Sequence, residues 1–393
     1  MIPPPRVAYD AETAGIRILF VGNSHLPQIG GAEVSTDHLV RALSDRGHIG
    51  AVLTGRPQRF VAGLRGTATR KPPFKPRRRI DHSLGYDVTY SVIPADSFLP
   101  VASQFRPDVV VVSGTDPLFA VDILRRSAPW PTVLFVRDVA FTPVAKDGSL
   151  HIDGLIANSK FLAREASDGA RHAIPLPALV DPDVYDVPTT RKIVLFVNPI
   201  PRKGVGIAWA LAEERPEIPF AFVPSWPLRP RVLLRLRMRA RHTPNVQIRR
   251  RVLDPRRLYS DCRVALIPSI GSDAVPRVIR EAQASGIPAL ASRTGGVPEA
   301  VGPGGILVSP DAPIEEWVRA LSRLWHDEGA YERLATRARE HSRREELDTE
   351  LILDRFELLM QQAVRRHERE CQAAGRPGLL VLGSERDLGA GRI

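Results

Sequence analysis

The chain has 393 residues, 43% hydrophobic and 25% charged, which is the composition of a globular protein. This length exceeds one ordinary core and predicts two domains. The two cysteines, Cys262 and Cys371, exclude a disulfide framework or a cysteine zinc cluster and favour a reducing compartment. The formal net charge of +11 favours acidic partners such as nucleic acid, anionic lipid or phosphorylated small molecules, unless biased composition alone accounts for the arginines.

The sequence shows neither a secretion signal nor a membrane-spanning segment. The N-terminal residues contain no apolar stretch typical of a signal peptide. The longest apolar runs, such as Val109 to Val112, are far shorter than the roughly 20 residues of a membrane helix. We therefore expect a cytoplasmic protein, with peripheral contact at the inner face of the membrane as an open alternative.

The chain begins with the pattern of a βαβ unit. The continuous apolar run 16–21 predicts a parallel strand buried on both faces. A loop containing Gly30-Gly31 follows, and Gly47 ends the next helical pattern. That pattern is the i, i+3, i+4, i+7 spacing of Thr36, Leu39, Val40 and Leu43. Residues 51–54 predict the second strand of the unit.

The rest of the first half alternates less regularly. Residues 57–81 are rich in Pro and Arg and predict an exposed loop. The prolines between 174 and 187 predict a linker. Strands are predicted at 108–112, 132–136 and 154–157, with a helix from Ser159.

A second alternating series begins at residue 193. It predicts strands at 193–197, 220–223, 246–248, 264–267, 289–291 and 306–308, with helices at 204–214 and through 313–372. Two such blocks predict two doubly wound α/β domains. We assign residues 1–185 to a Rossmann-like N-terminal domain, 186–372 to a second Rossmann-like domain, and 373–393 to a disordered tail.

The strongest chemical signal is the segment from Asp273 to Glu299, DAVPRVIREAQASGIPALASRTGGVPE. Asp273 and Glu281 are eight residues apart, Glu281 opens a helix-like stretch, and Gly295-Gly296 makes a tight turn. Loops at the carboxyl ends of parallel strands bind nucleotides in such sheets. A carboxylate there can accept two ribose hydroxyls, and the backbone N–H groups of a glycine turn can hold phosphates.

This segment resembles the signature of the family 4 glycosyltransferases, the large retaining group of the GT-B fold, in which two facing Rossmann-like domains enclose a cleft. The family pattern is E-x7-E, E-A-x-A-x-G-x-P and G-G-x-x-E, and residues 281–288 and 295–299 match its last two parts. The resemblance implies that Glu281 binds the donor ribose. Asp273 stands where the family has Glu, and the resemblance places it near the donor sugar with about one methylene less reach.

Two further segments carry the resemblance. Gly30-Gly31 begins a stretch similar to the family's N-terminal G-G-x-E loop, whose glycines let backbone approach the donor diphosphate. Lys203 is followed by glycine, as is the family lysine that neutralises the diphosphate. Family members usually have Gly-Arg a few residues earlier, where this chain has Asn198-Pro199, so Arg202 could supply the missing charge.

The resemblance covers about residues 15–330 and is more diffuse in the first half. Many relatives have a His after the strand that corresponds to 132–136, facing the donor sugar. Arg137-Asp138 occupies that place here. We expect both to line the cleft, Arg137 toward phosphate and Asp138 toward acceptor hydroxyls.

The resemblance implies a glycosyltransferase that moves a hexose or amino-hexose from a nucleoside diphosphate to an acceptor glycan, lipid-linked sugar or metabolite, with retention. Departure of the diphosphate would be eased by Lys203, Arg202 and the Gly31 N–H. The candidate catalytic residues are Asp273, Lys203, Arg137 and Asp138. The candidate donor-binding residues are Gly30, Gly31, Arg202, Lys203, Asp273, Glu281, Gly295 and Gly296.

No metal or other cofactor is expected from the sequence. It contains no Asp-x-Asp motif, and His25, His48 and His151 lack metal-like spacing. A GT-B site needs no metal where lysine and backbone groups neutralise the diphosphate.

Other functions remain open. A sugar-nucleotide epimerase can share the fold, and a catalytically silent nucleotide-sugar-binding protein is a further alternative. The arginine-rich stretch 228–242 is either a basic amphipathic helix on anionic membrane or a surface helix whose arginine stems cover apolar surface. Nucleic-acid binding is disfavoured, because only 6% of residues are aromatic and no aromatic-basic platform is present.

Overall fold

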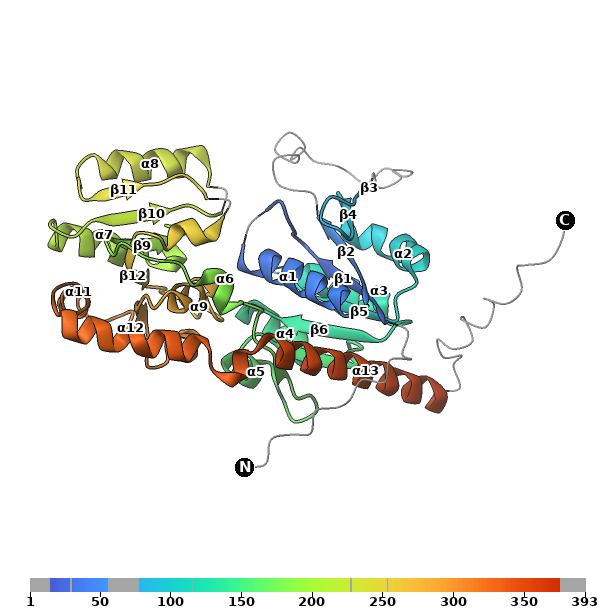
Figure 1. The fold of residues 1–393 in the computed structure, drawn as a ribbon. Helices are drawn as coiled ribbons and strands as arrows, with labels where there is room; N and C mark the ends of the chain where they lie inside the picture. The colour runs from blue at the N-terminus through green and yellow to red at the C-terminus, as the bar shows by residue number, and fades with distance from the viewer. Residues whose placement is uncertain are drawn as a thin grey trace, which may run out of the picture.

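The computed structural model describes residues 15–28, 30–55, 78–114, 116–226, 228–252 and 254–374. Two parallel-sheet domains lie side by side, so the predicted α/β class with two doubly wound domains is confirmed (Figure 1). Most of the predicted loop 57–81 and nearly all of the predicted tail 373–393 lie outside the described residues. None of the helices in the described part of the chain combines the length and apolar character needed to cross a bilayer.

The first sheet has eight strands in the order β3-β4-β2-β1-β5-β6-β7-β8. Neighbouring strands are parallel except for the antiparallel pair β3–β4. The strands are β1 Arg17–Gly22, β2 Ile49–Gly55, β3 Arg78–Asp81, β4 Asp87–Ser91, β5 Val109–Val112, β6 Thr132–Val136, β7 Gly154–Ala157 and β8 Ile174–Pro175. The helices are α1 Gly31–Asp45, α2 Pro94–Phe105, α3 Pro117–Ser127, α4 Thr142–Lys146 and α5 Lys160–Ala166.

Strand β5 shows why the apolar runs of this sequence form central strands. All four of its valines are buried. Val110 and Val112 join the core on one face of the sheet, and Val109 and Val111 join the core on the other. Helices must therefore cover both faces, as in other parallel sheets.

The second sheet has six parallel strands in the order β11-β10-β9-β12-β13-β14. The strands are β9 Ile193–Val197, β10 Phe220–Val223, β11 Val246–Ile248, β12 Cys262–Ile267, β13 Ala289–Ser292 and β14 Gly305–Val308. The helices are α6 Pro182–Tyr185, α7 Val205–Glu214, α8 Pro230–Ala240, α9 Arg277–Ala284, α10 Val297–Val301, α11 Ile314–His326 and α12 Glu328–Ser342. Short 3-10 turns at Pro201–Lys203 and Pro255–Leu258 follow β9 and β11.

The last helix, α13 (Thr349–Ala373), follows the second sheet in sequence but packs on the first (Figure 1). Its buried side chains belong to the core of the N-terminal domain, and the Phe356 ring stacks on Phe20 with centroids 6.2 Å apart. The sequence analysis placed these residues in the second domain. An amphipathic pattern identifies the apolar face of a helix but not the sheet that covers it.

Three local assignments differ from the sequence analysis. Residues 78–81 form the edge strand β3 instead of the end of a loop. The prolines of the predicted linker do not prevent β8 and α6 from forming within it. Strand β3 reads RRID and is mostly exposed, so it lacks the apolar pattern by which buried strands are recognised.

The packing of α13 can be tested by truncating one of its rings. We expect Phe356→Ala to lower the free energy of unfolding by about 3–5 kcal/mol, because a fully buried ring leaves a cavity between α13 and β1. Leu358→Ala on the same helix is the matched control. This side chain is exposed, and we expect a change within about 0.5 kcal/mol in urea denaturation. Equal effects of both changes would contradict this docking.

Candidate active-site cleft

A cleft of about 1070 Å³ lies between the two domains. Its walls come from loops at the carboxyl ends of the parallel strands, including those after β1, β6, β9 and β12. The structure brings together eight of the predicted site residues on these walls: Gly30, Gly31, Arg137, Asp138, Arg202, Lys203, Asp273 and Glu281. Gly295 and Gly296 are not among the lining residues.

The N-terminal end of α1 opens into this cleft. Gly30 is the N-cap residue and Gly31 the first helical residue, so the N-cap position supplies no side-chain hydrogen bond to the first turn. The first N–H groups of a helix have no partner within the helix and carry a partial positive charge. A Cβ at Gly30 would come within 2.3 Å of the Glu33 carboxylate and 3.2 Å of Trp226 Nε1. Glycine therefore allows both close approaches, and the uncapped end can receive an anion.

Arg137 donates hydrogen bonds to the first turns of α1. Its Nη1 donates to the Ala32 carbonyl at 2.8 Å and to Thr36 Oγ1 at 2.7 Å. The guanidinium also lies 4.1 Å from the centroid of the Phe135 ring. Burial lowers the pKa of Arg137 to about 10, so the group stays charged at neutral pH. These contacts make Arg137 a positioning group for α1 at the floor of the cleft.

On the opposite wall, Lys203 and Asp273 form an ion pair through Nζ and Oδ2. Ser269 donates a hydrogen bond of 2.8 Å to the same carboxylate oxygen. Both charged side chains are about 15% exposed, so they face the cleft but are partly desolvated. The Lys203 ammonium also lies 5.7 Å from the centroid of the Trp226 ring. The two residues predicted to meet the donor are therefore direct partners.

Glu281 lies in the middle of α9 and does not open it, contrary to the sequence analysis. Its Oε1 accepts from Arg277 Nε at 2.9 Å, and its Oε2 accepts from the Tyr259 hydroxyl at 2.6 Å. Burial and the Glu281 charge raise the pKa of Tyr259 well above its ordinary value, so the hydroxyl remains a donor. Glu281 lines the cleft while being firmly held on its buried side.

Arg277 crosses from α9 to the first domain. Its Nη1 donates to Ser35 Oγ at 3.2 Å and to the Leu179 carbonyl at 2.8 Å. Burial alone would lower the pKa of Arg277, but the Glu281 charge and the contacts with Tyr185 outweigh it and raise the pKa above its ordinary value. Sequence reasoning missed this residue, because an arginine in a helix usually belongs to the surface.

Two further carboxylates of the cleft also have cationic partners. Arg202, more than half exposed, contacts Asp138 across the cleft at 3.5 Å. Arg256 forms a 2.9 Å pair with its neighbour Asp254. Exposed pairs of this kind are weak and exchange partners readily. Arg202 is therefore the lining cation most easily turned toward an incoming anion.

Gly295 and Gly296 of the G-G-x-x-E motif contact the loop that carries Asp273, but they do not line the cleft. The Gly296 N–H donates to the Asp273 carbonyl at 2.8 Å. Gly295 has φ +56°, and a Cβ there would lie 2.3 Å from the same carbonyl oxygen. The turn therefore packs against the loop that carries Asp273. Its observed contacts are with protein backbone, whereas the sequence analysis placed both glycines against the donor.

Glu299, the last residue of that motif, connects the two domains. Its Oε1 accepts from the Lys160 N–H at 3.0 Å, and its Oε2 accepts from the Phe161 N–H at 3.2 Å. These N–H groups belong to the first turn of α5 in the N-terminal domain. Glu299 therefore caps a helix of the opposite domain.

Trp226 and Asn198 are lining residues that sequence reasoning did not select. Asn198 follows β9 with φ +60°, a conformation that Asn adopts more readily than most residues. Its Oδ1 accepts from the N–H groups of Ser225 and Trp226 at 2.9 and 2.8 Å. The only available signal was the unusual Asn-Pro after a buried strand.

Known proteins resemble this chain both in part of its sequence and in its fold. Residues 191–327 match the family described as Glycosyl transferases group 1, and the predicted donor residues of the second domain lie within this span. The D-inositol 3-phosphate glycosyltransferase of Corynebacterium glutamicum is 38% identical over 106 residues. That match covers 25% of each chain, so only about a quarter of this curated relative's length is matched.

Solved structures resemble the whole fold. Anabaena Alr3699/HepE in complex with UDP-glucose superposes with a TM-score of 0.70 at 18% identity, over 88% of this chain and 99% of that chain. A glycosyltransferase from Rickettsia africae gives a TM-score of 0.65 at 16% identity, over 90% and 99% of the two chains. The fold is that of the GT-B glycosyltransferases. The match to Glycosyl transferases group 1 lies within its second domain.

The supporting role of the glycine turn can be tested with one methyl group. We expect Gly296→Ala to lower the free energy of unfolding by about 1–3 kcal/mol, because the new Cβ would lie 1.7 Å from the Ala274 carbonyl oxygen. Gly206→Ala is the control, since Gly206 lies in α7 with open space around it. We expect that change to leave stability unchanged or raise it by up to about 1 kcal/mol. A neutral Gly296→Ala would contradict the close packing.

Proposed function

We propose that the protein is a glycosyltransferase that moves a sugar from a nucleoside-diphosphate sugar to an acceptor. The observation that carries this proposal is the convergence of three features on one cleft. These are the uncapped N-terminus of α1, the Lys203–Asp273 pair and the Glu281 carboxylate. The helix N-terminus can bind phosphate. Lys203 can exchange its aspartate partner for a phosphate oxygen, and the glutamate can accept hydrogen bonds from sugar hydroxyls.

The diphosphate would lie between the domains. The N–H groups of the first turn of α1, beginning at Gly31, would donate to phosphate oxygens from one side. Lys203 and Arg202 would approach from the other side. Binding would replace Asp273 as the partner of Lys203 by a phosphate oxygen, which leaves the aspartate next to the donor sugar. No metal is needed for this neutralisation.

The ribose would bind at Glu281. Both of its oxygens already accept hydrogen bonds from Arg277 and Tyr259, but a carboxylate has about four lone-pair sites. The remaining sites can accept the ribose hydroxyls. Because Glu281 is fixed by its partners, little side-chain entropy would be lost on binding.

The transfer itself breaks the bond between the anomeric carbon and the diphosphate oxygen, and the acceptor hydroxyl oxygen forms the new bond to that carbon. Negative charge develops on the leaving diphosphate, where Lys203, Arg202 and the α1 N-terminus stabilise it. The acceptor proton leaves with the diphosphate, whose oxygen can take it. Asp138 lines the cleft on the side of the first domain, and we propose that it accepts a hydrogen bond from an acceptor hydroxyl. Retention of configuration follows from the resemblance to the family 4 enzymes.

Lys203→Met tests the diphosphate contact. We expect the Kd for the preferred nucleoside diphosphate to rise roughly 10- to 100-fold, because a hydrogen bond to a charged group contributes about 1.5–3 kcal/mol. The measurement is isothermal titration, after a thermal-shift panel of nucleoside diphosphates and their sugars has identified the base. Lys146→Met, an exposed lysine on α4, is the matched control and should bind as the wild type does.

Failure of every nucleotide to stabilise the wild-type chain at millimolar concentration would refute the donor site. Glu281→Ala is a poor first variant, because it leaves the buried Arg277 without its carboxylate partner. The products separate the alternatives. A transferase releases free nucleoside diphosphate, an epimerase changes the sugar and leaves the diphosphate attached, and a silent binding protein does neither.

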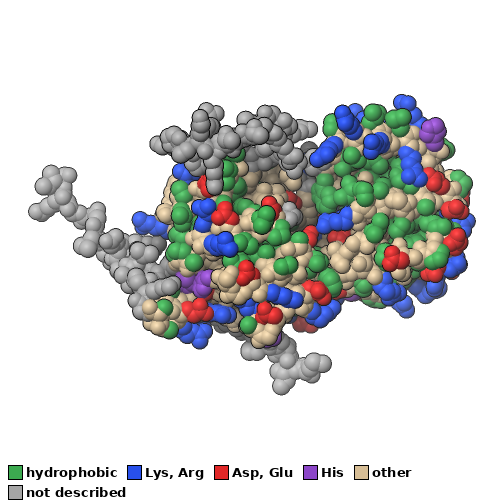
Figure 2. All heavy atoms as spheres, turned by 180° about the vertical axis from the view of Figure 1, so that it is seen from behind, with side chains coloured by type: hydrophobic (Ala, Val, Ile, Leu, Met, Phe, Trp, Pro, Cys, Tyr) green, Lys and Arg blue, Asp and Glu red, His purple; other side chains and the backbone are tan. Residues whose placement is uncertain are grey.

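We also propose that α8 contacts an anionic membrane surface. Leu234 and Met238 are 58% and 54% exposed, one turn apart on this helix. Five arginines lie on the same helix or directly after it: Arg231, Arg235, Arg237, Arg239 and Arg241. Basic and hydrophobic side chains intermix over this part of the surface, at the upper right of Figure 2. Arg239 covers the Trp209 ring as an ordinary surface arginine does, but Leu234 and Met238 are left exposed.

Vesicle binding tests the α8 surface. We expect the full chain to sediment with phosphatidylglycerol vesicles and not with phosphatidylcholine vesicles, with binding that weakens as salt rises. Leu234→Asp together with Met238→Asp should reduce the bound fraction several-fold. Leu358→Asp, an exposed leucine on α13, should leave it unchanged. Equal binding to both vesicle types would count against the proposal.

A further inference from the structure

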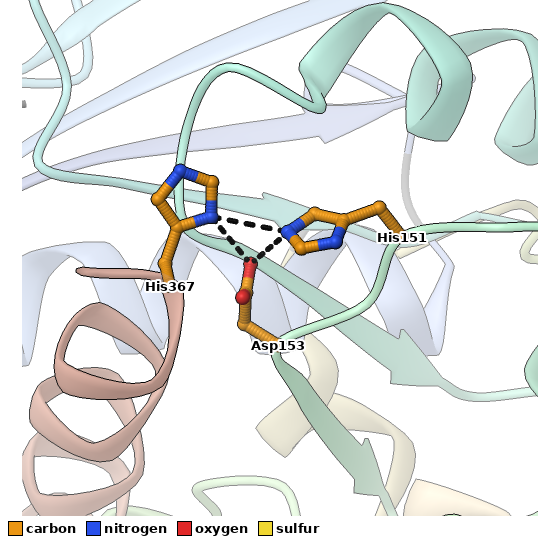
Figure 3. A group of neighbouring side chains, drawn as sticks. All are labelled: His151, Asp153 and His367. Carbon is orange, nitrogen blue, oxygen red and sulfur yellow. Dashed lines mark hydrogen bonds and ion pairs between the residues drawn. The ribbon is translucent and has the colours of Figure 1, made fainter. Parts of the chain in front are cut away.

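A compact group of His151, Asp153 and His367 lies outside the cleft (Figure 3). His151 and Asp153 immediately precede β7, and His367 is on α13. Asp153 Oδ2 accepts from the N–H of Thr132, the first residue of β6, at 2.7 Å. Arg137 follows the other end of β6. The group therefore sits at the amino edge of the first sheet, opposite the edge that forms the cleft.

Three atoms of the group converge on one point. His151 Nε2 lies 3.0 Å from Asp153 Oδ2 and 3.0 Å from His367 Nδ1. The third distance, from His367 Nδ1 to Asp153 Oδ2, is 3.3 Å. Figure 3 shows the two ring nitrogens and the carboxylate oxygen turned toward one another. The three atoms thus form a nearly equilateral triangle.

This triangle has the dimensions of one face of a metal coordination shell. The centre of the triangle is about 1.8 Å from each atom, whereas zinc binds imidazole nitrogen and carboxylate oxygen at about 2.0–2.2 Å. An ion at that distance would sit slightly out of the plane of the three atoms. Hydrogen bonds account for at most two of the three short contacts, because each imidazole nitrogen carries at most one N–H.

The charge of Asp153 gives an independent reason for a cation. The side chain has no exposed surface, and Oδ1 has no hydrogen-bond partner among the described residues. Burying an ionised carboxylate is costly unless it is paired or coordinates a metal. The neighbouring groups that could supply positive charge are the two imidazoles or an ion held between them.

We propose that His151, Asp153 and His367 bind one divalent transition-metal ion of the zinc type. Imidazole nitrogens disfavour Mg²⁺ and Ca²⁺, which prefer oxygen ligands. Three protein ligands leave a fourth position for water, on the side where His151 is partly exposed. Glu370, one turn after His367 on α13, lies 3.8 Å from His151 Nδ1, where carboxylates commonly orient metal-bound imidazoles.

The ion would connect two distant parts of the chain. His151 and Asp153 belong to the loop before β7, and His367 belongs to the helix that returns from the second domain. Metal binding would therefore hold α13 on the first sheet and contribute its binding free energy to the folded state. This site does not depend on the proposed transferase activity, because the donor cleft is at the other edge of the sheet.

Metal titration of the complete chain tests the site. The protein is prepared without an affinity tag, stripped with a chelator, and titrated with ZnCl₂ by calorimetry and with CoCl₂ by visible absorption. We expect one equivalent of Zn²⁺ to bind and to raise the melting temperature, and Co²⁺ to give the strong visible bands of a four-coordinate site. His367→Ala and Asp153→Asn should each weaken binding by at least about tenfold. His172→Ala, an exposed histidine elsewhere in the domain, should bind as the wild type does.

The competing explanation for the three short contacts is that His151 carries an additional proton and no metal ion binds. In that case Asp153 simply stabilises a protonated His151, whose pKa its hydrogen bond raises above the ordinary value. The absence of a one-equivalent metal complex in the wild-type chain would overturn the proposal, as would wild-type affinity in both ligand variants. If His367→Ala does not fold, His151→Gln replaces a partly exposed ligand and must show the same loss.

Discussion

The buried pair of Arg277 and Glu281 is the interaction on which the cleft depends. Arg277 lies on α9 of the second domain, yet it donates to Ser35 on α1 and to the Leu179 carbonyl in the connecting segment. The pair therefore fixes the carboxylate proposed to hold the ribose and, at the same time, fixes α1 relative to α9. A buried guanidinium is stable only while its partner is present, so the position of one wall constrains the other.

On the wall formed by the second domain, the position of Lys203 depends on a series of contacts. The turn at Gly295-Gly296 packs against the loop of Asp273, and Asp273 in turn holds Lys203. The cations of the wall are paired with carboxylates before any ligand arrives. An anionic ligand would therefore enter by exchange, replacing one negative partner by another, which costs less than desolvating a free lysine. The same exchange would release Asp273 toward the sugar.

The sequence predicted the buried parts of this fold better than its edges. Central strands such as β5 and β9 are continuous apolar runs, because both of their faces are covered. The edge strand β3 is polar and exposed, so it resembles a loop. The docking of α13 on the first sheet could not be predicted, because it depends on which apolar surface remains uncovered after both domains have formed.

The candidate site was also predicted only in part from the sequence. Motif spacing was enough to bring Lys203, Asp273 and Glu281 to one cleft, since loops after parallel strands meet at one edge. It could not show that Arg277 is buried, because burial of an arginine depends on partners about 100 and 240 residues away. Nor could it suggest the His151–His367 contact, which joins residues 216 positions apart.

Asn198 determines the shape of the cleft beside Lys203. Asn198 has a positive φ of +60° and uses its side chain to fix the backbone at Trp226. Trp226 then lies beside Gly30 and over Lys203, so it narrows the cleft next to this lysine. A narrower, less hydrated site strengthens each electrostatic contact. The proposed contact between Lys203 and a phosphate would therefore depend on Trp226 as well as on the lysine charge.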